Sequence, residues 1–249
     1  MMKEVIEQFE AYVHEFDLTN FDLERKYRHS YRVMKLMEQL AYSLKLSEED
    51  VTLACIIGLL HDIGRFEQLK EVDSYDDTKF EHADFGAQYL KTSHFLEQCH
   101  VPDIWHPIIF TAVQYHNKYD IPEYLDEKTL LFTKLIRDAD KIDILRLTIE
   151  KKQESTGEVR QQVMDEFYQK KQIHILPGFS KKEFVFVRLG FLYDLNFRKS
   201  FELVKEDEFL NQYYEVLDRP EELKEYFDFS RVYLEQQLKE EEHYVRYKI

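Results

Sequence analysis

Apolar residues recur every three or four positions through the first part of the chain, the spacing of one face of an α-helix. Residues 3–16 show this pattern, and so do residues 21–44, where Thr19-Asn20 precedes the first turn as a cap. His29 lies on the apolar face of the second segment. Both segments are therefore predicted to be helices, with His29 pointing toward the interior.

A run of almost entirely apolar residues covers positions 51–60 and ends at His61-Asp62. The preceding Ser47-Glu48-Glu49-Asp50 resembles a capping box, which predicts the start of a helix. A helix that is apolar nearly all round should be buried. Two ionisable residues at its end are unfavourable there unless something pairs with them. A metal ion is the simplest partner, because imidazole and carboxylate supply one neutral and one anionic ligand.

The segment that follows, residues 64–79, is polar and is predicted to be a loop able to cover a site. Apolar spacing then predicts three more helices, over residues 81–91, 103–116 and 127–151. His82 would lie in the first turn of the first of these helices. His116 would end the second, and Asp140 would lie in the third.

Composition changes after about residue 151. Residues 151–157 read as a link, and residues 173–179 as a turn or a short strand. The rest is predicted to form two or three helices, with Glu240-Glu241-Glu242 on a solvated face. We expect a first domain over residues 1–150 and a helical extension over residues 151–249 that packs on it. The aromatic side chains of this extension are interpreted as packing or as a homo-oligomer interface.

Glycine and proline are scarce, with six and five residues in 249, whereas sheet proteins need turn residues more often. An all-α fold is therefore predicted. The net charge of −15 disfavours duplex nucleic acid as a partner. An anionic small molecule could still bind where metals and a few Lys or Arg residues reverse the local sign.

Neither a signal peptide nor a membrane span is predicted. No stretch of eighteen apolar residues predicts a membrane span, and the first ten residues are too acidic for a signal peptide. The two cysteines, Cys55 and Cys99, do not suggest a disulfide framework. These features predict a cytoplasmic protein.

Six side chains of metal-binding type lie at intervals, each group on or beside a different predicted helix: His29, His61-Asp62, His82, His116 and Asp140. Ligands on separate helices can converge in a bundle core. Four imidazoles and two carboxylates suit Mn, Fe, Ni, Co or Zn better than Mg or Ca. One ion that keeps coordination positions open for water and substrate needs fewer than six protein ligands. Two ions are therefore expected, with Asp62 as the best bridge between them.

The order of these residues resembles the HD superfamily of metal-dependent phosphohydrolases over roughly residues 20–150. Its defining set corresponds to His29, His61-Asp62 and Asp140, and the resemblance favours Asp140 over Asp138 as the ligand. His82 and His116 are similar to the additional histidines of the dinuclear branch, which includes phosphodiesterases of cyclic dinucleotides. The resemblance implies a helical bundle with a dinuclear metal site.

Two departures separate the chain from particular branches of that superfamily. The Glu-Asp pair of alarmone hydrolases is absent, and Arg65 stands where the mononuclear nucleotidase branch has an acid. A cation at this offset resembles the phosphate-contacting Lys of cyclic-dinucleotide phosphodiesterases, but their Gly-Tyr-Pro signature is missing. The substrate class is therefore left open by the resemblance.

The expected activity is hydrolysis of a phosphate ester in a nucleotide or related small molecule by metal-activated water, with phosphodiester cleavage favoured. Asp62 and Arg65 are the expected catalytic residues, and Arg65, Lys118 and Lys141 the expected phosphate contacts. Lys141 is the weaker contact, because its side chain points about 100° away from that of Asp140. Alternatives are a phosphomonoesterase or nucleotide pyrophosphohydrolase, a di-iron oxygenase on the same frame, and a regulatory module with a structural ion.

Overall fold

A computed structural model describes residues 1–239 of the chain, and the predicted acidic face at Glu240-Glu241-Glu242 lies outside that range. The regular secondary structure of residues 1–239 is helical throughout, without a strand, which confirms the all-α prediction. The chain divides into two compact units, residues 1–140 and a second unit that starts at Lys141. The boundary falls inside one long helix, α8 (Glu127–Thr148). That residues 151–249 pack on the first part stays a prediction.

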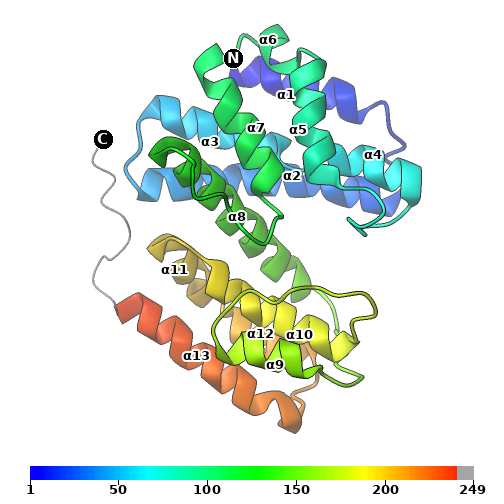
Figure 1. The fold of residues 1–249 in the computed structure, drawn as a ribbon, viewed down its shortest axis with the longest axis vertical. Coiled ribbons are helices and arrows are strands. Elements are labelled where there is room, and N and C mark those ends of the chain that lie inside the picture. Colours follow the sequence, from blue (N-terminus) through cyan, green and yellow to red (C-terminus); the bar gives the residue numbers. More distant parts are fainter. Residues whose placement is uncertain (240–249) are drawn as a thin grey trace. The chain divides into compact units, whose positions relative to one another are not determined.

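The first unit is a bundle in which α2 packs along α3, and α5 packs against both α4 and α7 (Figure 1). Its elements before α8 are α1 (Met2–Val13), α2 (Phe21–Ser43), α3 (Glu48–Leu60), α4 (Ile63–Val72), α5 (His82–Thr92), α6 (Phe95–Gln98), the 3₁₀ turn η1 (Asp103–Trp105) and α7 (His106–Tyr115).

Side-chain caps explain where three of these helices begin. The Asn20 side chain accepts hydrogen bonds from two backbone N–H groups at the start of α2. Ser47 accepts one at the start of α3, and Glu81 accepts one at the start of α5. Each bond satisfies a backbone donor that has no partner within the helix. These caps fix the starts of the helix that contains His29, the helix that ends just before His61, and the helix that begins at His82.

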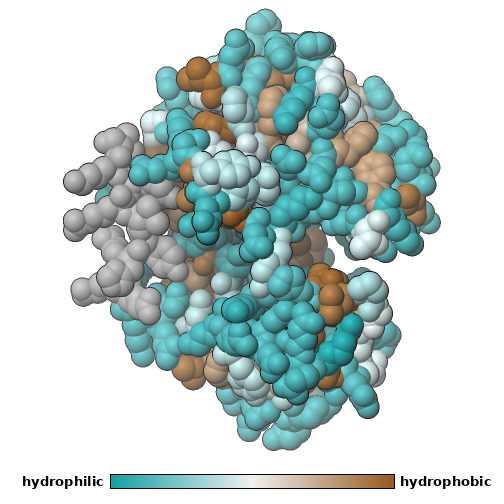
Figure 2. Space-filling view, viewed as in Figure 1, coloured by the Kyte–Doolittle hydropathy of each residue, from teal (hydrophilic) through white to brown (hydrophobic). Residues whose placement is uncertain are grey.

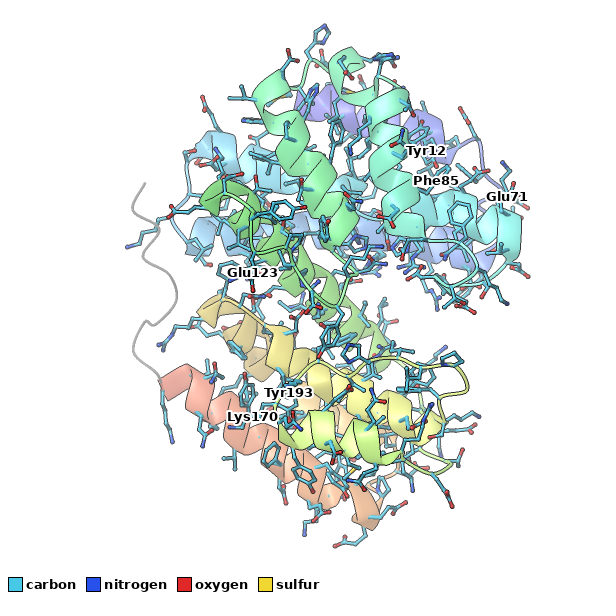
Figure 3. All side chains as sticks on the ribbon, in the orientation of Figure 1. Tyr12, Glu71, Phe85, Glu123, Lys170 and Tyr193 are labelled. Carbon is cyan, nitrogen blue, oxygen red and sulfur yellow. The ribbon has the colours of Figure 1, made fainter. Side chains whose placement is uncertain are left out.

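The prediction of a loop over residues 64–79 is wrong in its first half, because α4 occupies residues 63–72. Ile63, Phe66 and Leu69 are buried along one face of this short helix, at a helical spacing that the surrounding polar residues obscure. Tyr12 of α1, labelled in Figure 3, donates a hydrogen bond to the Ile63 carbonyl at 3.1 Å. A loop remains only over residues 73–81.

The second unit contains five α-helices and two 3₁₀ turns among its described residues after α8. They are α9 (Gln161–Tyr168), α10 (Lys181–Gly190), η2 (Phe191–Asp194), α11 (Arg198–Glu206), α12 (Phe209–Val216), η3 (Glu221–Leu223) and α13 (Lys224–Lys239). Phe167 is fully buried against the rings of Phe186, Tyr193 and Tyr226. Figure 3 labels Tyr193, which is half-buried in this unit.

Two or three helices were expected after the link, so that prediction is wrong. The breaks after α11 and α12 carry no glycine to reveal them, because the chain turns there at non-glycine residues. Glu208, between α11 and α12, has a left-handed φ of 48°, and Asp218 and Arg219 after α12 have φ values of 62° and 51°. Residues 171–180 form a turn at Pro177-Gly178 rather than a strand.

Hydrophilic residues cover most of the face drawn in Figure 2, as expected for a chain with a net charge of −15. Among the described residues, none of the helices combines the length and the apolar character that crossing a bilayer requires.

Candidate metal centre

All six candidate ligands meet in the core of the first unit, although they come from separate helices. His29 lies within α2, His61 directly follows α3, and Asp62 is the N-cap of α4. His82 is the first residue of α5, His116 directly follows α7, and Asp140 lies within α8. Five of the six residues are buried, and 14% of the Asp140 side chain is exposed. A cluster so enclosed could hold an ion with little competition from bulk water.

His29, His61 and Asp140 form the first half of the cluster. The Nε2 atoms of the two histidines are 3.2 Å apart. Asp140 Oδ1 lies 3.1 Å from the His29 Nε2 and 3.7 Å from the His61 Nε2. These three donor atoms converge on one point from three helices, as the ligands of a single ion do.

His82 and His116 form the second half, with their Nε2 atoms 3.1 Å apart. Asp62 stands between the two halves and turns one oxygen toward each. Its Oδ1 lies 3.1 Å from His82 Nε2 and 3.5 Å from His116 Nε2. Its Oδ2 lies 3.5 Å from His29 Nε2 and 3.6 Å from His61 Nε2. Asp62 therefore has the position of a bridging carboxylate.

Hydrogen bonds on the far side of three imidazole rings fix their tautomers. The Nδ1 of His61 donates to the Gly58 carbonyl at 2.8 Å, and the Nδ1 of His116 donates to the Val113 carbonyl at 2.7 Å. The Nδ1 of His82 donates to a carboxylate oxygen of Asp77 at 2.6 Å. In the neutral rings each Nε2 is then a lone-pair acceptor that faces the centre.

When both rings are neutral, the second half of the cluster thus presents two imidazole lone pairs and one carboxylate oxygen to one another. Such a set of buried acceptors is unfavourable until a cation is shared by all three. The residues present therefore fit a divalent transition metal. Imidazole-rich sites of this kind suit Zn, Fe, Mn, Co or Ni.

Ionisation of the two carboxylates supports this fit. Burial opposes ionisation of Asp62, but the Lys26 ammonium and the His61 ring outweigh it and hold the Asp62 pKa well below its usual range. The pKa of Asp140 is lowered in the same way, by His29 and His61. Burial lowers the pKa of His116 to about 4. At neutral pH both carboxylates are charged and His116 is neutral, which are the metal-binding forms.

Burial also disfavours the charged form of His61, but Asp62 and Asp140 outweigh burial and raise the His61 pKa. The centre therefore attracts positive charge, and a metal would compete with a proton at this ring.

Asp77 holds His82 in place through the ring nitrogen that faces away from the cluster. One oxygen accepts hydrogen bonds from His82, from Arg65 at 2.8 Å and from Gln68 at 3.0 Å. The other accepts from Asn117 at 3.2 Å. Burial opposes ionisation of Asp77, but His82 and Arg65 lower its pKa below the usual range. Asp77, Glu81 and His82 also have donor atoms within 4.8 Å of one another, but Asp77 already accepts these hydrogen bonds, so we assign Asp77 to orienting His82.

Arg137 on α8 anchors the end of α7, which carries His116. Its buried guanidinium donates to the carbonyl of Tyr115 at 3.0 Å and to the carbonyls of Lys118 and Tyr119. These carbonyls lie at and beyond the C-terminal end of α7, where positive charge is favoured. Because Arg137 lies one turn before Asp140 on the same helix, this contact fixes His116 relative to Asp140.

A family model of the HD domain matches residues 27–145, a range that contains all six residues of the cluster. The chain contains an HD domain. Proteins of this superfamily are generally metal-dependent hydrolases. No curated protein and no solved structure matches the chain.

The three cations predicted to contact phosphate lie in different surroundings. In the HD domain, the Nε of Arg65 lies 3.5 Å from Asp62 Oδ1, while its terminal nitrogens contact Asp77 and Gln68. Lys118 pairs with Glu81 and Asp84, each at 2.9 Å. Lys141, in the second unit, pairs with Asp194 at 2.6 Å. The phosphate contacts of all three stay predictions, and Arg65 is the one placed beside the HD-domain cluster.

Three residues around the HD-domain cluster were not predicted from the sequence: Lys26, Asp77 and Arg137. Lys26 carried a usable signal, because it precedes His29 by three positions and so shares its helix face. Asp77 lies in the segment expected to be a loop, where several acidic residues looked equivalent. Arg137 resembled an ordinary helix cation, since only the tertiary structure brings the end of α7 against it.

Proposed function

We propose that the chain is a metal-dependent phosphohydrolase that cleaves a phosphate ester of a nucleotide or related small molecule, with a phosphodiester as the favoured substrate. One observation carries the proposal, namely that the Asp62 carboxylate stands between two pairs of imidazole Nε2 atoms. His29, His61 and Asp140 would hold one ion, His82 and His116 the other, and Asp62 would bridge them.

A bound divalent metal activates water at neutral pH and offsets the charge of phosphate oxygens. The protein's own part is to keep its ligands fixed, with the Nδ1 protons of three rings turned away from the centre. Gly58 and Val113 hold the Nδ1 protons of His61 and His116, and Asp77 holds that of His82. This leaves the lone pairs of all three rings facing inward.

Arg65 supports a phosphate substrate in particular. Its Nε is buried and has no hydrogen-bond partner among the described residues, although it lies near Asp62. A buried guanidinium N–H without an acceptor is unfavourable. An anionic oxygen of the substrate would satisfy this donor, as Arg does in many phosphate sites.

Metal content is the first test. Protein purified without chelator is expected to contain two transition-metal equivalents per chain. The paired substitution His82→Ala and His116→Ala is expected to reduce this to one, and Asp62→Ala to abolish both metal binding and activity. Full turnover of the Asp62 variant with full metal content would exclude the scheme. The exposed pair His94→Ala and His100→Ala is the matched control.

The substrate class is tested with chromogenic esters on the metal-loaded protein. We expect bis(p-nitrophenyl) phosphate to be cleaved faster than p-nitrophenyl phosphate, because two ions suit in-line attack on a diester. The reverse order would indicate a phosphomonoesterase. If neither ester is cleaved and the Fe(II)-loaded protein shows substrate-dependent oxygen uptake, the protein is an oxygenase instead.

A further inference from the structure

Lys26 contacts Asp62 directly and belongs neither to the histidine set nor to the predicted phosphate contacts. It lies on α2, three positions before His29, and its Nζ is 2.6 Å from Asp62 Oδ2. The side chain is 14% exposed, whereas that of Asp62 is 3% exposed. The ammonium thus reaches the cluster while part of the side chain stays accessible to solvent.

The ring of Tyr75, from the loop after α4, lies beside both cations that approach Asp62. Its centroid is 5.6 Å from the Lys26 Nζ and 5.7 Å from the guanidinium carbon of Arg65. The Tyr75 hydroxyl donates to the Asp22 carboxylate at 3.1 Å, which ties the loop to α2. Lys26 and Arg65 are therefore held on one aromatic ring, and they approach different oxygens of Asp62.

With two divalent metal ions bound, the charges in this region would favour an anionic partner. Lys26 and Arg65 are outnumbered by Asp62, Asp77 and Asp140, so one negative charge remains in excess. Two divalent cations would turn that excess into three positive charges. In that state Asp62 shares its charge with the metals and Lys26 loses much of its counter-charge. A chain with a net charge of −15 would then contain a localised site for an anionic group.

We infer that Lys26 binds a non-bridging oxygen of the substrate's phosphate beside Asp62 Oδ2, whereas Arg65 lies beside Asp62 Oδ1. This inference rests on the proposed function. It differs from a purely structural role, in which the Lys26 ammonium would only neutralise Asp62. A structural lysine would affect metal content and stability, whereas a substrate contact affects the binding of the phosphate anion.

The test compares Lys26→Gln and Lys26→Arg with Lys35→Gln, an exposed lysine on the same helix. Each protein is loaded with Mn²⁺, its metal content is measured, and inorganic phosphate is titrated by calorimetry. Lys26→Gln is expected to keep its metal and to bind phosphate at least roughly tenfold more weakly, the loss of one charge-assisted hydrogen bond. Lys26→Arg should retain most of the affinity, and Lys35→Gln all of it.

Three results would overturn the inference. Unchanged phosphate affinity in Lys26→Gln, or no phosphate binding by the metal-loaded unsubstituted protein, would exclude a phosphate contact. Loss of metal in Lys26→Gln would show that Lys26 positions Asp62 instead. In these cases ester hydrolysis by the unsubstituted protein would still support the proposed function. If the unsubstituted protein takes up no metal and cleaves no ester, the proposed function fails together with the inference.

Discussion

The carbonyl oxygen of His82 lies so close to Gly64 that a Cβ atom at position 64 would stand 2.1 Å from it. The same Cβ would stand 2.9 Å from the backbone nitrogen of Gly86. The start of α4 and the first turn of α5 are therefore in backbone contact. This contact brings His82 next to Asp62, two residues before Gly64, and so completes the second half of the cluster.

Gly64→Ala is expected to separate α4 from α5, since neither neighbouring atom belongs to a flexible side chain. Overpacking of this kind lowers the free energy of unfolding by about 1–3 kcal/mol or more. Displacement of His82 should also remove about one metal equivalent per chain. Urea unfolding and elemental analysis measure the two effects, with the exposed Gln88→Ala on α5 as control. A variant with unchanged stability and full metal content would contradict the backbone contact.

Asp77→Asn is expected to weaken metal binding at the second half by about 10–100-fold, the usual effect of losing the carboxylate that orients a histidine ligand. The amide is neutral and can present its NH₂ group to the His82 Nδ1, which would turn the ring. Metal affinity is measured by competition with a chelator. Glu71→Gln, an exposed position labelled in Figure 3, is the control. Equal affinities in the Asp77 and Glu71 variants would show that His82 needs no orienting carboxylate.

Arg137→Met is expected to destabilise the first unit, because the carbonyls at and beyond the end of α7 would lose their donor. Charge-assisted hydrogen bonds contribute about 1.5–3 kcal/mol each, so a loss of about 3 kcal/mol in unfolding free energy is anticipated. Chemical denaturation measures it, and Lys134→Met on the same helix serves as the reference. An unchanged free energy of unfolding in Arg137→Met would mean that water replaces the guanidinium at the Tyr115 and Lys118 carbonyls.

Glu183 in the second unit provides a pH test that is independent of the metal centre. Hydrogen bonds from Arg160 lower the pKa of this buried carboxyl from its ordinary value of 4.5 to about 2. Because the folded-state pKa is the lower one, the ionised carboxylate stabilises the fold above pH 4.5. That contribution is lost as the pH falls from 4.5 toward 2.

Glu183→Gln should therefore reduce stability at pH 7, and the difference from the unsubstituted protein should shrink between pH 4.5 and pH 2. Urea midpoints at pH 7, 4 and 3 measure this trend, with the exposed Glu158→Gln as control. A difference that stays constant across this range would mean that the charge of Glu183 contributes nothing to the fold.

The sequence alone determined the helical class and most helix positions in the first unit. Apolar spacing revealed α2 and α3 because long amphipathic or wholly apolar segments carry a strong periodic signal. Six candidate ligands could be predicted because a buried ionisable pair such as His61-Asp62 needs a partner, and the order of the others resembles the HD superfamily. The signal failed for α4, where only Ile63, Phe66 and Leu69 mark the buried face. It failed again at Glu208, where a non-glycine residue turns the chain.

Only the tertiary structure decided which atoms of these ligands face one another. Whether Asp62 presents one oxygen to each histidine pair depends on how closely the helices approach, and that is set by contacts such as Gly64 against His82. Asp77 and Arg137 could not be distinguished from surface charges in the sequence, because a residue's partners across a bundle lie tens of positions away. Local periodicity specifies which face of a helix is buried, whereas the packing of different helices specifies what that face meets.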